Sequence, residues 1–279
     1  MIEASADGII LVEPKLKSDS RLVILLGSPE GIKGASRKLT SLNGVKKVRK
    51  GLFIIQGYSK SHEAIIQSQS FVSFIKTREI PSTRKRLEDE YSNRVFSVVA
   101  FSYNNPTAQQ KKRVERLIKK STGIRLRPGI ILFPLLKAKE QRRVLGPEDE
   151  RVLIDSKDFS RLIRENGGTT IRLSRLRIVN LDGVNNLKYA IEQTLTRDLI
   201  PLEEKIRSLR ETIRDTTVPI AHLKKSYTPL SHRFRELKTK WMTARKLWLY
   251  DAGKALKRTY NMLINTRRAI VSEEVRRAG

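Results

Sequence analysis

The sequence predicts an α+β fold: two tandem βαββαβ modules followed by a long α-helical hairpin or small bundle. The first observation behind this prediction is a pattern that occurs twice, about 78 residues apart. It reads NGVKKVRKGLFII at 43–55 and TGIRLRPGIILF at 122–133. Each copy is a basic strand, a two-residue turn that ends in Gly51 or Gly129, and an apolar strand. The second observation is that apolar residues recur at helical spacing after residue 183.

The same elements flank both hairpins. An apolar strand and a helix precede each hairpin, and a short helix and a further strand follow it. The first strands are expected at 22–26 and 95–101, the later helices at 63–69 and 156–166, and the last strands at 71–80 and 169–179. The order strand, helix, strand, strand, helix, strand is that of the ferredoxin-like arrangement. We therefore predict ferredoxin-like modules at 1–81 and 94–180, a linker at 82–93, and a basic α-helical extension at 181–279.

Local signals place the ends of the upstream helices. Ser28 and Asn105 each precede a proline, so we expect each of them to be a helix N-cap with proline in the first turn. Gly44 and Gly123 are expected to close these helices as C-cap glycines.

Two further expectations concern the sheets. In the last strand of the second module, the alternation of apolar and polar residues slips at Ser174-Arg175, which predicts a β-bulge. Each module also has one sheet face that its own helices do not cover. The two sheets are therefore expected to pair as an intramolecular pseudo-dimer.

The helical extension shows two apolar stripes. The first runs from Leu187 to Ile213 and is expected to break or bend near Pro201. The second begins after Pro229 and has a weak point at 251–253. Two long helices with matching stripes form an antiparallel hairpin or a small bundle. Trp241 and Trp248 lie seven residues apart on the second stripe, and we expect core packing rather than base stacking for both.

The composition indicates a strongly basic protein. Lys and Arg number 57 against 29 Asp and Glu, which gives a net charge of +28. The absence of cysteine excludes disulfides, thiolate metal ligands and thiol catalysis. It also suits a reducing or hot environment, as the many charged residues would suit a thermophile. No apolar run approaches about 18 residues, and residues 1–7 lack a signal-peptide pattern, so we expect a cytoplasmic protein without membrane partners.

Nucleic acid is the usual partner of a chain this basic. The alternatives are a solvated basic surface without a particular partner and, with less support, an anionic membrane surface. A long basic helix can lie along a duplex or in its groove, and the last helical segment is such a helix. The side chains expected to bind nucleic acid are Arg245, Lys246, Lys254, Lys257, Arg258, Arg267 and Arg268 of that segment, Arg125 and Arg127 of the second hairpin, and Arg84, Lys85 and Arg86 of the linker.

Residues 116–134, RLIKKSTGIRLRPGIILFP, support a resemblance to known families. The segment resembles the hairpin of a ferredoxin-like module shared by CRISPR-associated spacer-acquisition subunits, the central domain of phenylacetate-pathway repressors (PaaX) and the N-terminal region of chromate-resistance regulators (ChrB). The last group is the most similar in layout, and the resemblance covers residues 94–270. It implies a nucleic-acid-associated, often regulatory, protein. Instead of a winged-helix segment like that of the repressors, the front of this chain carries a second copy of the module.

The resemblance also admits an enzyme, because some acquisition subunits are similar to metal-dependent nucleases with an Asp at the end of the first strand. Here Asn104 and, in the first copy, Gly27-Ser28 take that position, and a neutral amide is a poor metal ligand. The three histidines lack ligand spacing. The acidic groups at 148–150 and at Asp155 and Asp158 are explained by a solvated insertion and by a helix N-terminus.

We therefore expect no catalysis, no metal and no cofactor. The predicted function is that of a non-catalytic nucleic-acid-binding protein, a DNA-binding regulatory or chromatin-associated factor. The alternatives are an RNA-binding or ribosome-associated factor and a metal-dependent nuclease related to the spacer-acquisition subunits. The sequence leaves DNA against RNA, and monomer against homodimer, open.

Overall fold

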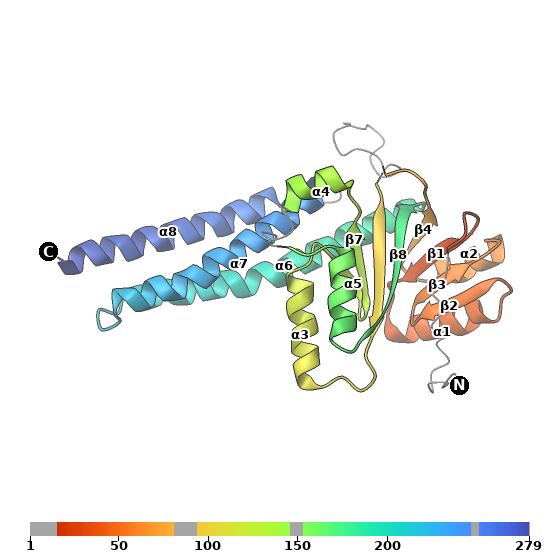
Figure 1. The fold of residues 1–279 in the computed structure, drawn as a ribbon, viewed down its shortest axis with the longest axis horizontal. Coiled ribbons are helices and arrows are strands. Elements are labelled where there is room, and N and C mark those ends of the chain that lie inside the picture. The colour runs from red at the N-terminus through yellow and green to blue at the C-terminus, as the bar shows by residue number, and fades with distance from the viewer. Residues whose placement is uncertain (1–15, 81–93, 146–152, 247–250, 279) are drawn as a thin grey trace. The chain divides into compact units, whose positions relative to one another are not determined.

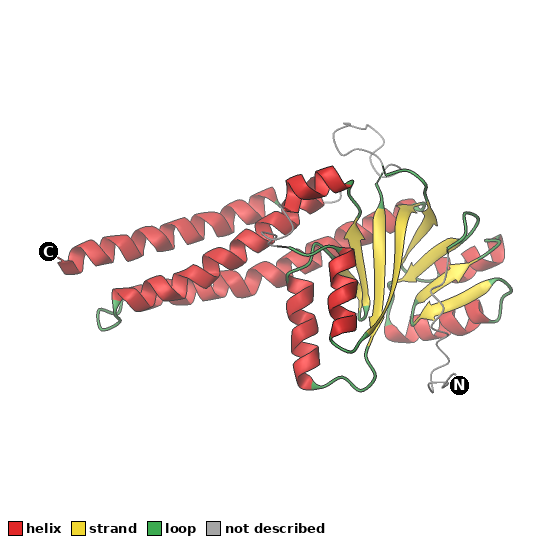
Figure 2. Ribbon diagram, viewed as in Figure 1, coloured by secondary structure: helices red, strands yellow, loops and turns green. Residues whose placement is uncertain are grey.

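The computed structural model describes residues 16–80, 94–145, 153–246 and 251–278. It confirms an α+β protein, in which the described strands form one antiparallel sheet of eight and long helices follow at the C-terminal end (Figure 2). Two compact units divide the chain. The sheet unit comprises 1–141 and 154–190, and the helical unit comprises 142–153 and 191–279. The first predicted module, 1–81, therefore falls within the sheet unit, and so does the second, 94–180, apart from residues 142–153.

The sheet unit consists of two halves with the same order of elements, except that the second half has one additional helix, α4 (Figure 1). The first half consists of β1 (Arg21–Leu25), α1 (Pro29–Thr40), β2 (Val45–Arg49), β3 (Leu52–Ile55), α2 (Lys60–Gln67) and β4 (Phe71–Lys76). The second half consists of β5 (Phe96–Ser102), α3 (Ala108–Lys119), β6 (Ile124–Arg127), β7 (Ile130–Pro134), α4 (Ala138–Leu145, which extends into the helical unit), α5 (Ser156–Glu165) and β8 (Thr169–Ile178). Helix α4 is an element that the sequence did not predict.

The strand order is β2-β3-β1-β4-β8-β5-β7-β6. Each half thus has its first strand between its third and fourth, and the two halves join through their fourth strands, β4 and β8. Three residue pairs form this junction, from Phe74 opposite Ile178 to Lys76 opposite Leu176. The two halves therefore join edge to edge in a single sheet, a contact that the sequence did not indicate.

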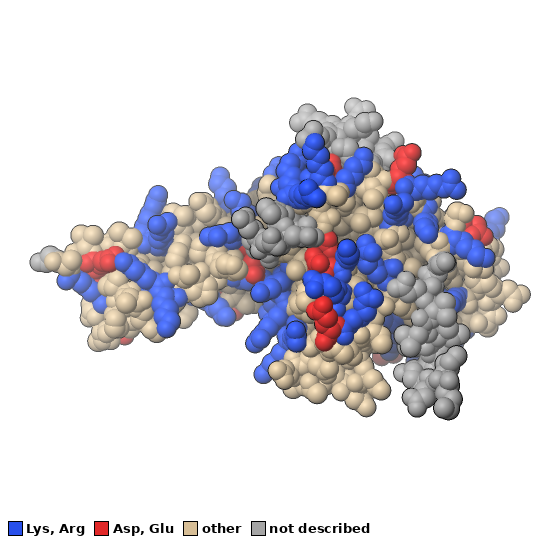
Figure 3. Space-filling view, in the orientation of Figure 1, with Lys and Arg blue, Asp and Glu red and all other residues tan. Residues whose placement is uncertain are grey.

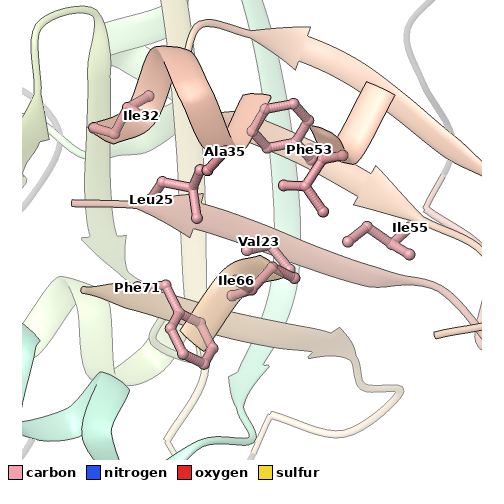
Figure 4. Packing of buried hydrophobic residues seen from close by; sticks show 9 residues of the cluster. Val23, Leu25, Ile32, Ala35, Phe53, Ile55, Ile66 and Phe71 are labelled. Carbon is pink, nitrogen blue, oxygen red and sulfur yellow. The ribbon is translucent and has the colours of Figure 1, made fainter. Parts of the chain in front are cut away.

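Helices cover one face of each half. In the first half, Val23 and Phe53 of the sheet pack against Ile32 of α1 and Ile66 of α2, all fully buried (Figure 4). In the second half, the equivalent cluster joins the strands to α3 and α5 and is centred on Phe159. Apolar side chains at every second strand position drive this packing, since successive residues of a strand point to opposite faces.

The other face of the sheet is buried as well. Leu22 and Ile24 of β1 and Leu132 of β7 alternate with the helix-facing residues, yet they are at most 1% exposed. Arg127 at one edge of the sheet donates from Nη1 to the carbonyl of Leu25 in β1, at 2.9 Å, although β6 and β1 are five strands apart in the sheet order. The sheet therefore curls back on itself, and the open apolar faces of the two halves are enclosed together.

A β-bulge in β8 permits this arrangement and confirms the prediction at Ser174-Arg175. Arg175 has φ +60°, and the register against β5 shifts there, so that Ser97 pairs with Ser174 and Phe96 with Leu176. Beyond the bulge, Leu176 also pairs with Lys76 of β4. One strand thus joins both halves.

The helix caps were predicted correctly in the first half only. Ser28 caps α1 by accepting from the amide of Gly31 at 3.2 Å. In the second half the cap is Thr107, not Asn105, because Thr107 and Gln110 exchange two hydrogen bonds in a capping box. Asn105 instead adopts φ +46° in the preceding turn.

The C-cap predictions for Gly44 and Gly123 were wrong. The C-cap residues are Ser41 for α1 and Lys120 for α3, both in right-handed conformation. Gly44 has φ +77°, but it lies just before β2, and its carbonyl accepts from the amide of Gln56.

The glycine turn of each hairpin lies next to the guanidinium of an arginine from the other hairpin. A Cβ built on Gly51 would collide with the guanidinium of Arg127, and one built on Gly129 would collide with that of Arg49. Both glycines have φ above +70°. Burial lowers the pKa of both Arg49 and Arg127. Each half therefore places the last residue of its basic strand over the glycine turn of the other.

The helical unit contains the rest of α6 (Leu181–Ile213), α7 (Ile220–Lys246) and α8 (Gly253–Ala278). The extension is thus built from three long helices, where the stripes predicted two. Asp251 accepts from the amide of Gly253 at 2.9 Å at the start of α8, which is the predicted weak point. Trp241 is 1% exposed and packs in the core as expected, whereas Trp248 lies outside the described residues.

Helices α6 and α7 both continue through a proline, so the break considered near Pro201 is absent. Pro201 lies inside α6, and Pro229 lies inside α7 instead of preceding it. Both prolines are exposed, and so are Arg197 and Lys225, the residues four positions earlier whose carbonyls lose an intrahelical partner. Packing of the opposite, apolar faces therefore outweighs one lost hydrogen bond per helix.

A buried ion pair lies between α6 and α7. Lys240 Nζ is 3.5 Å from Asp198 Oδ2, and both side chains are less than a tenth exposed. Burial lowers the pKa of Lys240, and the nearby Asp198 carboxylate opposes this shift only in part. Such a pair adds little net stability, because both ions are removed from water.

The contact between the hairpin turns predicts unequal effects at two glycines. Gly51→Ala and Gly57→Ala each force alanine into a left-handed conformation, φ +77° and +61°, which costs about 1–2 kcal/mol. Gly57 has open space around it, whereas Gly51→Ala also displaces Arg127. We expect Gly51→Ala to lower the free energy of unfolding by about 1 kcal/mol more, measured by urea denaturation. In an Arg127→Met background this difference should vanish; a difference that persists there contradicts the assigned contact.

The buried ion pair predicts opposite outcomes for single and double variants. Asp198→Asn leaves the Lys240 charge without its carboxylate and should cost about 3–5 kcal/mol. Asp198→Leu combined with Lys240→Met should be neutral or stabilising. Because the unfolded chain holds the Lys240 proton more tightly than the native protein, wild-type stability should rise with pH from the lowered pKa toward 10.5. The double variant should lack this rise, and an identical pH profile would show that Lys240 does not titrate as assigned.

Candidate nucleic-acid interface

Helix α8 presents a stripe of basic and amide side chains to solvent. Lys254, Lys257, Arg258 and Arg268 recur at three- and four-residue spacing, with Asn261 and Asn265 between them; all six are exposed. The opposite face carries the buried residues Leu256, Thr259, Leu263, Thr266 and Ile270. From Gly253 to Ser272 the helix contains no acidic residue. The stripe from Lys254 to Arg268 spans about 21 Å at 1.5 Å per residue.

Arg267 lies apart from this stripe. It shares a side of α8 with the exposed Tyr260 and Val271, which lie seven and four residues away along the helix, and this side differs from that of Arg268. The ring of Tyr260 packs against Phe234 of α7, with 5.8 Å between centroids. Arg267 is therefore exposed, but it borders an apolar contact and does not extend the row of cations.

Arg258 has a structural partner. Its Nε and Nη2 donate to Oε1 of Glu203 at 3.2 and 3.0 Å, and Nη2 also donates to Oε2 at 3.0 Å. The Glu203 side chain is 4% exposed and accepts a further hydrogen bond from the hydroxyl of Thr259. Arg258 thus neutralises a buried carboxylate, although its own side chain remains 66% exposed.

The remaining predicted residues of the helical unit differ in their surroundings. Arg245 is exposed and lies 3.7 Å from Asp251, an exposed and therefore weak pair. The surroundings of the Lys246 side chain lie outside the described residues. Helix α7 adds the exposed cations Arg235 and Lys238. Helix α6, in contrast, carries more acidic than basic residues.

Arg125 and Arg127, the two arginines of the second hairpin, both make polar contacts with other residues of the sheet unit. Arg125 Nη2 pairs with Oε1 of Glu115 in α3 at 2.5 Å. Arg127 donates a hydrogen bond to the carbonyl of Leu25, and its guanidinium lies over Gly51. Arg127 is thus a structural residue, and it offers little to a phosphate. Arg84, Lys85 and Arg86 lie outside the described residues.

Helix α3 carries a second set of exposed cations that the predicted site omits. Lys111, Lys112, Arg113 and Arg116 lie on its solvent side, while Val114 and Ile118 are buried against the sheet. Figure 3 shows Lys and Arg gathered where Figure 1 places α3 and α5. The signal was present in the sequence as an amphipathic helix whose polar face is basic.

The positions considered for a nuclease hold structural groups. Asp155 caps α5, with Oδ1 accepting from the amides of Lys157 and Asp158 at 2.7 and 2.9 Å. His62 belongs to the capping box of α2 and is hydrogen-bonded to Ser59. Residues 148–150 lie outside the described residues. Across the described ranges, no three His, Asp or Glu side chains come together as a metal site.

Comparison with known proteins adds no identification: the sequence matches no model of a protein family and no characterised protein. Among the described helices, none combines the length and apolar character needed to cross a membrane.

Proposed function

We propose that the protein is a non-catalytic nucleic-acid-binding protein, acting on DNA as a regulatory or chromatin-associated factor. The observation that carries the proposal is the stripe on α8, an exposed row of cations and amides without an acidic residue. Cations bind phosphates and release counterions, while Asn side chains donate to phosphates or to base edges. A solvated helix face would more commonly mix both charges, as α6 does.

The dimensions of the stripe suit a duplex. A stripe about 21 Å long runs beside roughly a dozen backbone charges, because duplex DNA carries one per about 1.7 Å. The interface that we propose consists of Lys254, Lys257 and Arg268, with Asn261 and Asn265 between them and Arg245 at one end. Arg258 contributes positive potential while it remains bound to Glu203.

The fold supports the same class of function. We propose that the two halves of the sheet unit are duplicated ferredoxin-like modules, since each has the strand order expected of that module and the element order βαββαβ, with α4 as an additional helix in the second half. The proposed kinship with the ChrB N-terminal region, the PaaX central domain and the spacer-acquisition subunits rests on that module. The absence of a carboxylate at Asn104, which follows β5, is the reason for proposing binding without cleavage.

RNA, including a ribosome-associated role, is the second candidate. The basic surface of α3 favours it, because a folded RNA presents phosphates in several directions and can engage separate basic helices.

Removal of the α8 stripe tests the interface. In Lys254→Gln/Lys257→Gln/Arg268→Gln, binding should weaken roughly tenfold or more, equally for all sequences, because phosphate contacts carry no base information. The slope of log K against log salt should fall by roughly 2–3, since each phosphate contact contributes about 0.9. Fluorescence anisotropy with a labelled duplex at several salt concentrations measures both quantities. Arg258 is left in place because it stabilises the buried Glu203.

The matched control removes three exposed cations from α6 and the following turn, Lys205→Gln/Arg210→Gln/Arg214→Gln. Both variants lose the same charge, so a general effect of net charge would weaken them equally. The proposal requires the α8 variant to be the weaker binder by a clear margin. Equal affinities and equal salt slopes in folded proteins would show that the stripe is only a solvated face.

Recovery of the protein from its native cell distinguishes DNA from RNA. We expect sequencing of the bound nucleic acid to yield DNA, and Mg²⁺ or Mn²⁺ to leave added DNA and RNA intact. Co-sedimentation with ribosomal subunits that survives DNase would establish the RNA-binding alternative instead. Cleavage lost on substitution of Asp149 or Asp155 would establish the nuclease.

A further inference from the structure

A pocket opens on the sheet unit where α3, the end of β5 and the second hairpin turn meet. Its cavity volume is about 280 Å³. Its lining includes Arg49 from the first half and Lys111, Glu115 and Arg125 from the second, together with Phe101 and Tyr103. Three cations and one carboxylate thus surround a space the size of a small metabolite.

The charges in this pocket do not balance. Glu115 is the one acidic residue in the lining, and it pairs with Arg125. Arg49 and Lys111 form no ion pair with any described residue, which leaves the lining with two positive charges in excess. Burial lowers the pKa of Arg49 without an opposing carboxylate. The Nε of Arg125 is buried without a hydrogen-bond partner among the described residues.

The position of Arg49 is built into the fold. Its guanidinium lies over Gly129, which has no side chain to obstruct it. Arg49 is the last residue of β2 and reaches the pocket only because the curled sheet brings the first half to the second hairpin. A half-buried cation held in this way costs desolvation energy, which an anionic ligand would recover.

The aromatic wall of the pocket is rigid. The hydroxyl of Tyr103 donates to the carbonyl of Ile163 at 3.4 Å and accepts from Nδ2 of Asn166 at 3.2 Å. Phe101 packs edge-on against Tyr103, with 6.5 Å between ring centroids. A flat ring can stack or pack against such a wall without ordering it first.

We propose that this pocket binds a nucleoside 5′-monophosphate, with Arg49, Lys111 and Arg125 holding the phosphate and the aromatic wall holding the base. A phosphomonoester carries about −1.5 to −2 charges at pH 7 and matches the excess of two in the lining. A phosphodiester or a carboxylate carries one charge and leaves one cation of the lining unpaired. The phosphomonoester has two sources, a free mononucleotide or the 5′-phosphorylated end of a strand. The proposal does not depend on nucleic-acid binding by α8.

Calorimetric titration of the full-length protein with the four nucleoside 5′-monophosphates tests the proposal. We expect at least one to bind roughly tenfold more tightly than the corresponding 3′,5′-cyclic monophosphate, its nucleoside or inorganic phosphate, since one charge-assisted contact is worth about that factor. Arg49→Gln and Lys111→Gln should each weaken binding roughly tenfold. Lys112→Gln, one residue along α3 and outside the lining, and the α8 triple variant should bind as the wild type does.

Lys111 is exposed on a helix surface, so its variant remains informative even where Arg49→Gln destabilises the sheet. Short oligonucleotides with a 5′-phosphate or a 5′-hydroxyl distinguish the two sources. Displacement of the mononucleotide by the phosphorylated strand alone identifies a strand end as the ligand. Displacement by neither strand identifies the free mononucleotide. Equal affinity for nucleoside and monophosphate, or unchanged affinity in Lys111→Gln, would overturn the proposal.

Discussion

The sheet unit depends on one strand, β8, which pairs with β5 along one edge and with β4 along the other. The bulge at Arg175 makes this possible, because it turns the end of the strand toward β4 after six pairs with β5. Without that pairing, β4 and β8 would be exposed edges and each half would leave an apolar face open. With it, Phe74 and Phe96, from the two halves, pack edge-on at 6.1 Å between ring centroids.

The curled sheet also determines the surroundings of two arginines, Arg49 and Arg127. It brings β2 and β6, the two ends of the strand order, close enough for Arg127 to bond Leu25 and for Arg49 to lie over Gly129. These contacts need a glycine in each turn, because any side chain there would occupy the space of a guanidinium. The repeated pattern of basic strand, glycine turn and apolar strand is thus explained by a contact between its two copies.

Local patterns in the sequence were sufficient for much of the fold. Alternation and turn chemistry located the strands, the hairpin glycines and the bulge, since each depends on residues near one another in the chain. Where two nearby residues could take the same role, the sequence did not predict the outcome. Asn105 and Thr107 are both good N-caps, and Thr107 takes that position because it exchanges two hydrogen bonds with Gln110. Contacts between distant residues had no local signal at all. The junction of β4 with β8 and the hydrogen bond from Arg127 to Leu25 belong to this class.

The same distinction applies to the net charge of +28, which does not show which cations are free to bind. In the helical unit the buried or bridging cations are compensated: Lys240 by Asp198, Arg258 by Glu203, and Arg233 by Glu236 at 2.6 Å. Lys254, Lys257 and Arg268 on α8 are exposed and pair with no described carboxylate, so they remain hydrated and carry no desolvation cost. The pocket beside α3 differs from both, since Arg49 is half-buried and no described carboxylate neutralises it. A cation that is desolvated and unpaired is the costliest of the three to maintain, and a bound dianion is the simplest compensation for it.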